Sequence, residues 1–177
     1  ELVNVVAVLP GRSPRRVYIS GHYDTVNLRA AMAGVRPSTP GQQPAPNHDV
    51  DAPGANDDGS GTALTIELAR VFAESGLDFD ATLVFIAWAG EEQGLIGSMA
   101  HATALADAKG VVEANFNNDI VGSSLGGNGI IDAESVKIYS LGPEDSMSRS
   151  LARYIARIAG VYVPSHTIRL MAREDRF

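Results

Sequence analysis

The segment ATLVFIAWAGEE at residues 81–92 is the stretch that most strongly decides the fold. Residues 81–89 are apolar almost throughout, which is typical of a central strand in a parallel sheet covered on both faces. Glu91 and Glu92 follow directly, and adjacent carboxylates repel each other unless water or a cation neutralises them. Open α/β sheets bind ligands at the carboxyl ends of such strands. The segment predicts a buried strand that leads into a binding site, with a solvated acidic loop as the alternative.

Strand-like and helix-like segments alternate around this strand. β-rich runs at 2–9 and 17–20 are separated by a Pro- and Gly-containing stretch that indicates a hairpin or turn. Apolar residues with helical spacing predict a helix at 62–75 that stops at Gly76. The other expected elements are helices at 97–108 and 143–160 and strands at 116–121, 136–141 and 167–171. This alternation indicates an α/β sheet with helices on both faces.

Length and composition exclude several classes of protein. A chain of 177 residues suggests one domain over 1–177, and a net charge of −7 argues against a nucleic-acid partner. No apolar run reaches the roughly 18 residues of a membrane span. Cys is absent, so only His and carboxylates can bind a metal. The Pro-rich stretch at 27–53 is interpreted as a loop insertion at the rim of a site.

Two further pairs of polar residues lie beside the expected strands and helices. On a strand, His22 and Asp24 share a face, so Asp24 can orient a metal-binding His22; a buried His with an ordinary solvated Asp is the alternative. Asp57 and Asp58 stand among small residues just before the helix at 62–75. One of their carboxylates could bridge two cations, or the pair could simply cap the helix.

Asp119 is the last candidate metal ligand along the chain. It lies at or within the expected strand at 116–121, and a buried carboxylate there needs a partner, whereas an exposed loop acid does not. Each of these signals alone is modest. Together they predict a carboxylate-rich metal site, because one sheet edge could gather all four acidic segments.

At this point the chain resembles the M28 family of zinc peptidases. The similar segments, which occur in the family's order, are SGHYD at 20–24, PGANDDGSG at 53–61, AGEEQGLIGS at 89–98 and NNDIVG at 117–122. The resemblance implies a three-layer α/β/α sandwich with a mixed, largely parallel central sheet that has eight strands in the family. It also implies a peptide or small amide substrate, two zinc ions per complete domain and aminopeptidase-type hydrolysis by a metal-activated water.

The resemblance also implies a role for each matching residue. His22 and Asp119 would bind different zinc ions, and Asp57 would bridge them. Glu92 would bind the ion that His22 does not. Glu91 would be the general base, and Asp24 would support a ligand from behind.

One part of the family pattern is missing. The second zinc-binding His of the family lies further downstream, and the chain ends at 173–177, about where that segment should begin. His166 is a weak substitute, and surface or packing roles are expected for His48 and His101. We therefore expect a fragment with few or no bound zinc ions and little activity alone. Its incomplete sheet would offer an edge through which copies could associate.

Alternative functions remain open from the sequence. The M20 metallohydrolases share a His-x-Asp strand and consecutive glutamates, and glutaminyl cyclases share the M28 fold with one zinc ion. A non-catalytic M28-like interaction module is a third alternative, especially for a truncated chain. A secreted or periplasmic location is implied only by similarity to secreted members.

Overall fold

The computed structural model describes residues 1–33, 47, 49–126 and 128–173 of the chain. The chain divides into two compact units, Glu1–Ser123 and Ser124–Phe177. That residues 1–177 form a single domain stays a prediction. In the described parts of the chain, no helix combines the length and hydropathy that a bilayer crossing requires.

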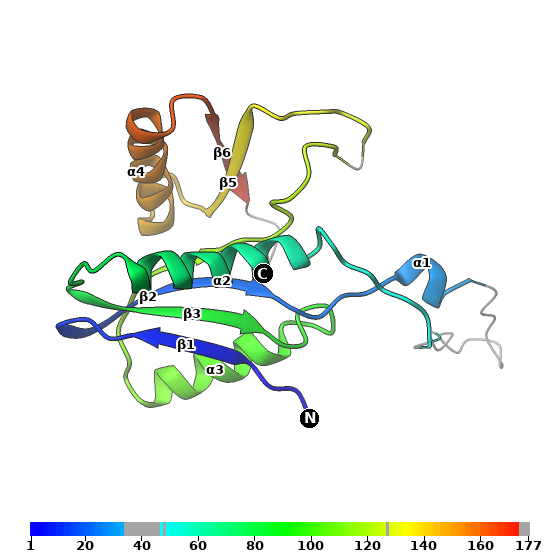
Figure 1. Cartoon of the computed structure of the whole chain (residues 1–177), viewed down its shortest axis with the longest axis horizontal. Helices are drawn as coiled ribbons and strands as arrows, with labels where there is room; N and C mark the ends of the chain where they lie inside the picture. Colours follow the sequence, from blue (N-terminus) through cyan, green and yellow to red (C-terminus); the bar gives the residue numbers. More distant parts are fainter. Residues whose placement is uncertain (34–46, 48, 127, 174–177) are drawn as a thin grey trace. The chain divides into compact units, whose positions relative to one another are not determined.

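The first unit is built on a four-stranded mixed sheet (Figure 1). Its strands are β1 (Val5–Leu9), β2 (Ser13–His22), β3 (Ala81–Trp88) and β4 (Val112–Asn117), in the order β1-β3-β2-β4. β2 pairs in parallel with both β3 and β4, and only β1 runs antiparallel to its neighbour β3. Of the two alternatives for residues 10–14, a hairpin or a turn, the hairpin is therefore wrong, because β3 separates the two strands that flank it.

Helices cover the two faces of this sheet. α2 (Gly59–Glu74) lies on one face and α3 (Ile96–Asp107) on the other (Figure 1). Alternate residues of β3 divide between the faces, as the two-residue period of a strand requires. The two core clusters follow this division: Leu83 and Phe85 pack with Leu68 and Phe72 of α2, and Val84 and Ile86 pack with Leu105 of α3. The expected α/β/α sandwich with a mixed, largely parallel sheet is confirmed.

Most expected boundaries in this unit are close to the observed ones. The helix predicted at 62–75 begins earlier, because the Asp58 side chain accepts the Gly61 N–H and caps α2 at its start. Gly76, with a φ of +66°, follows the end of the helix as predicted. The strand expected at 116–121 instead ends at Asn117, so Asp119 lies in a loop beyond it.

The predicted loop at 27–53 is partly described. It contains one short helix, α1 (Leu28–Ala31), whose first turn is capped by the Asn27 side chain. Residues 34–46 and 48 lie outside the described residues, so their place at the rim of a site stays a prediction. The Thr25 hydroxyl donates to the carbonyl of Ala52, which joins the two ends of this stretch.

The second unit is a single β-α-β arrangement. β5 (Ser135–Leu141) and β6 (Thr167–Arg173) pair in parallel, and α4 (Met147–Tyr162) connects them. Ser146 caps α4 by accepting the Arg149 N–H. The helix expected to begin at Pro143 and end at Gly160 is therefore shifted toward the C-terminus by the position of its cap.

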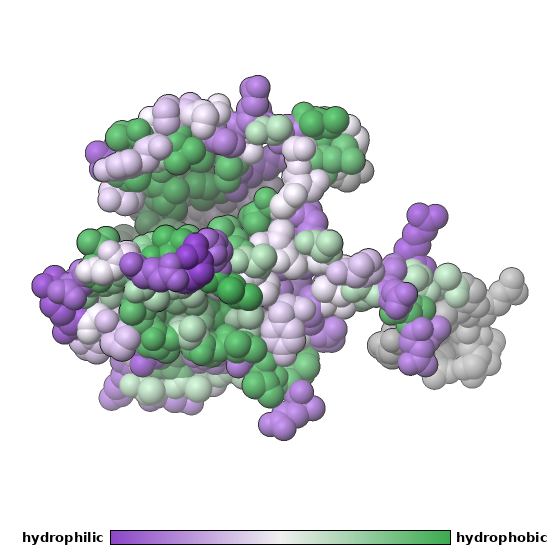
Figure 2. Space-filling view, viewed as in Figure 1, coloured by the Kyte–Doolittle hydropathy of each residue, from purple (hydrophilic) through white to green (hydrophobic). Residues whose placement is uncertain are grey.

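β1 forms one edge of the four-stranded sheet. Val5, Val6 and Val8 on this strand are exposed, and Figure 2 shows apolar residues at the surface over β1 and the neighbouring part of the sheet. Edge strands with exposed apolar residues can pair with other chains. Association through the sheet edge stays a prediction.

The core predicts a specific pattern of stability. Ile86 is 0% exposed, so Ile86→Ala should lower the free energy of unfolding by about 2–5 kcal/mol through lost burial and the cavity it leaves. Ile66, on α2, is 65% exposed, so the matched Ile66→Ala change should cost less than about 0.5 kcal/mol. Urea unfolding followed by circular dichroism measures both, and equal losses would contradict the assigned core.

Candidate metal centre

The ends of three neighbouring strands bring the candidate residues to one edge of the sheet. β2 ends at His22. β3 and β4, which flank β2 in parallel, end shortly before Glu91 and Asp119. Parallel strands present their carboxyl ends at the same edge, so residues distant in sequence meet there.

His22 is the buried centre of the group, with 2% of its surface exposed. Its ring Nδ1 lies 3.0 Å from the backbone oxygen of Asp24, and its Nε2 lies 3.3 Å from Asp57 Oδ1. If Nδ1 donates to that carbonyl, the neutral ring keeps the lone pair on Nε2, directed toward the acids. This is the orientation that a metal-binding imidazole requires.

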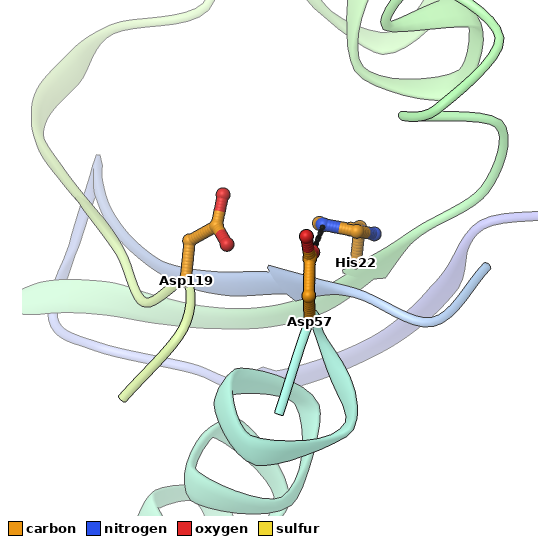
Figure 3. Close-up of side chains that lie close together, drawn as sticks. All are labelled: His22, Asp57 and Asp119. Carbon is orange, nitrogen blue, oxygen red and sulfur yellow. Dashed lines mark ion pairs between the residues drawn. The ribbon is translucent and has the colours of Figure 1, made fainter. Parts of the chain in front are cut away.

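His22, Asp57 and Asp119 form a group that could hold a metal ion. One ligand atom from each residue lies within 4.8 Å of the others. Figure 3 shows the three side chains pointing toward one another from β2, from the turn before α2 and from the loop after β4. One imidazole nitrogen and two carboxylates are donors that suit zinc. The side chain of Asp57 is 52% exposed, so a substrate could approach it.

The adjacent acids Asp57 and Asp58 have different roles. Asp57 points toward His22, whereas Asp58 is 0% exposed and caps α2. Asp58 also accepts the backbone N–H of His22 at 2.9 Å. The helix-capping interpretation is therefore confirmed for Asp58, and metal binding by Asp57 stays a prediction.

Asp24 supports the site through its backbone and its side chain. Its carbonyl faces the His22 ring, while its carboxylate lies 3.8 Å from the same ring nitrogen. The two carboxylate oxygens instead accept the backbone N–H groups of Glu91 at 3.0 Å and Glu92 at 3.1 Å. Asp24 thus joins the end of β2 to the loop after β3.

Glu91 and Glu92 lie near the group of three without belonging to it. Glu91 Oε2 is 3.9 Å from His22 Nε2. Glu92 is close enough to Asp57 for their charges to interact. These two acids are therefore placed beside the candidate metal site and not at its centre.

Burial and like charges shift the protonation of the site. Burial raises the pKa of Asp119, and the nearby carboxylate of Asp58 raises it further. Burial also raises the pKa of Glu92, with a further rise from Asp57. For His22, burial lowers the pKa, but the Asp24 carbonyl and the surrounding carboxylates outweigh it, so the net pKa is raised. Crowded acids around an imidazole form a site that favours a cation.

Two other histidines, His101 and His166, are among the described residues. His101 packs against Tyr18 and Trp88, and its Nε2 is 3.0 Å from the Tyr18 hydroxyl, so the expected packing role is confirmed. His166 belongs to the second compact unit, where its ring contacts the Ser165 hydroxyl. His48 lies outside the described residues.

Sequence reasoning missed one residue that supports the site. The Thr62 hydroxyl, in the first turn of α2, donates to the backbone oxygen of His22 at 2.8 Å. This contact ties the helix to the end of β2. Thr62 directly follows the Gly-Ser-Gly segment, but a single threonine in a helix gives no signal of a contact 40 positions away.

The chain is similar to known proteins along almost its whole length. The sequence model of peptidase family M28 matches residues 4–171. A probable zinc metalloprotease of Pyricularia oryzae is 40% identical over 198 aligned residues, which cover 100% of this chain and 36% of the relative. The chain thus spans little more than a third of that relative's length.

Two solved structures share the fold. The Legionella pneumophila LapA aminopeptidase superposes with a TM-score of 0.67 at 24% identity, over 97% of this chain and 38% of that one. An aminopeptidase from Aneurinibacillus sp. strain AM-1 gives a TM-score of 0.62 at 27% identity, over 96% and 34%.

The raised pKa values predict how zinc binding depends on pH. If His22 and Asp119 are ligands, zinc must displace protons from them, and their pKa values lie above the ordinary 6.5 and 3.8. Affinity should therefore be highest above these raised values and fall as the pH drops through them, by about tenfold per pH unit for each displaced proton. Competition with a chromophoric chelator between about pH 5 and 8 measures this dependence.

Asp119→Asn provides the control, because it removes one of the titrating ligands. Its affinity should be lower throughout and less sensitive to pH. An affinity that does not change with pH would contradict the assigned ligands.

Proposed function

The chain belongs to peptidase family M28, and on that premise we propose that it carries the active centre of a zinc-dependent aminopeptidase. The observation that carries the proposal is the convergence of ligand atoms from His22, Asp57 and Asp119 within 4.8 Å, with Glu91 directly beside them. The aminopeptidase from Aneurinibacillus, whose fold this chain shares, supports this choice of reaction.

The proposed metal centre assigns His22, Asp57 and Asp119 to one zinc ion. Their mutual proximity supports this over the expectation that His22 and Asp119 bind different ions. Glu92 would help to hold a second ion, because its charge interacts with Asp57 while it lies outside the group of three. Asp57 would then contribute to holding both ions.

Glu91 is the proposed general base. Zinc, when bound, would lower the pKa of a water ligand and polarise the carbonyl of the scissile bond. Glu91 would accept the proton of the attacking water and pass it to the leaving amine. Its position supports this role, because its carboxylate lies 3.9 Å from the ligand nitrogen of His22 and its backbone is held by Asp24.

The surplus of acids suggests how an aminopeptidase would select its substrate. Glu91 and Glu92 stand beside Asp57, and together they give the site a strongly negative potential. A free α-amino group is positively charged, so the negative potential of this sheet edge would attract the N-terminus of a peptide toward the site. Cleavage would then be restricted to the first peptide bond. A secreted enzyme is part of this proposal through the family resemblance.

Glu91→Gln tests the proposed reaction. The amide keeps the size of the side chain but cannot accept a proton, so kcat should fall by about 10²–10⁴-fold. Hydrolysis of aminoacyl p-nitroanilides by the whole protein measures this, with zinc content and circular dichroism recorded in parallel. Glu134→Gln, an exposed change in the second unit, is the matched control and should leave kcat unchanged.

Unchanged turnover in the Glu91→Gln protein would contradict the role of Glu91. Activity that survives complete removal of zinc would contradict the proposed metallopeptidase itself.

A further inference from the structure

Three side chains from one short segment bind the backbone that follows Asp119. The N–H of Ile120 donates to Asp58 Oδ1 at 3.3 Å, and the N–H of Val121 donates to Ser60 Oγ at 3.0 Å. The N–H of Gly122 donates to Asn56 Oδ1 at 2.8 Å. Three consecutive peptide groups are therefore held by Asn56, Asp58 and Ser60, which we call the acceptor ladder.

The acceptor ladder alternates with a metal-ligand candidate. Asn56, Asp58 and Ser60 face the backbone after Asp119, and Asp57 points instead toward His22 (Figure 3). Residues 56–60 thus supply the candidate ligand Asp57 and also hold the segment that carries the candidate ligand Asp119.

Asp58 also contacts the segment that carries the third candidate ligand, His22. Its Oδ1 accepts the N–H groups of Gly61 and Ile120, and its Oδ2 accepts the N–H of His22. This single buried carboxylate therefore contacts the end of β2, the start of α2 and the loop after β4. These are the three segments that carry His22, Asp57 and Asp119.

The backbone after Asp119 needs such support. Ile120 has a φ of +54°, in the left-handed region that β-branched residues rarely adopt. The segments are also packed closely: a Cβ at Gly61 would meet the backbone oxygen of Asn118 and the Asp58 carboxylate. A turn held in an unfavourable conformation relaxes when its hydrogen bonds are removed, and the direction of the adjacent Asp119 side chain changes with it.

We propose that Asn56, Asp58 and Ser60 are positioning residues that set the metal affinity of the site by fixing Asp119 relative to His22 and Asp57. The proposal rests on the metal centre proposed above. It predicts that residues without a direct bond to the metal control how tightly the metal is held, because ligand placement and not ligand identity changes when they are replaced.

The decisive variant is Asn56→Ala combined with Ser60→Ala. It removes two of the three ladder acceptors and leaves all ligands and the Asp58 cap in place. Zinc affinity of the protein should fall about 10–100-fold, as replacement of residues behind metal ligands usually produces. The visible spectrum of the Co²⁺ form should also change, because it reports the geometry of the ligands.

Two controls separate positioning from a general loss of stability. Ser98→Ala removes a matched hydroxyl from the first turn of α3, where it donates to the Leu95 carbonyl, and should leave metal affinity unchanged. Ser60→Thr keeps the acceptor oxygen and should restore the affinity lost in Ser60→Ala. Asp58→Asn should weaken zinc binding more than the double variant does. If the Asp58→Asn protein does not fold, the Asn56→Ala, Ser60→Ala double variant alone tests the positioning role.

Asp57→Asn distinguishes failure of this inference from failure of the metal centre. If Asp57→Asn binds zinc as the unmodified protein does, the proposed metal centre is wrong. If Asp57→Asn weakens binding but the double variant keeps the original affinity and Co²⁺ spectrum, the positioning role is overturned and the metal centre stands. A loss in Ser98→Ala equal to that in the double variant would also overturn it.

Discussion

The parallel pairing of β2 with both β3 and β4 is the constraint on which the rest of the structure depends. It places the carboxyl ends of three strands at one edge of the sheet, so that His22 meets Glu91 and Asp119. α2 and α3 bury the two faces of the sheet that presents this edge. A metal site needs ligands held in a defined geometry. His22 lies at the end of β2 itself, whereas Asp57 and Asp119 lie in the segments that adjoin the sheet edge.

The charges at this edge explain why the site favours a cation. The described centre contains one imidazole and several carboxylates, and burial raises the pKa of Asp119, Glu92 and Asp58. Without a bound cation, such acids either repel one another or retain protons. A divalent ion removes both costs at once. The same crowding of carboxylates would therefore favour a bound divalent cation over the metal-free site.

The sequence predicted the elements well and their contacts poorly. The apolar run at 81–89 and the helical spacing at 62–75 are local signals, so both elements were predicted within a few residues. The position of β3 between β1 and β2 was not predicted, because an apolar run does not indicate which strands it pairs with. Likewise, the residue types marked Asp57 and Asp58 as a pair, but only the fold shows that one faces the site and the other holds three backbone segments.

Anomalous diffraction from crystals of the zinc-loaded protein is the most direct test of the account. Data collected on both sides of the zinc absorption edge locate the ion without assumptions about its ligands. A peak is expected about 2.0–2.2 Å from an atom of each of His22, Asp57 and Asp119. The absence of a peak at these three residues, or separation of their side chains in the crystal, would contradict the proposed metal centre.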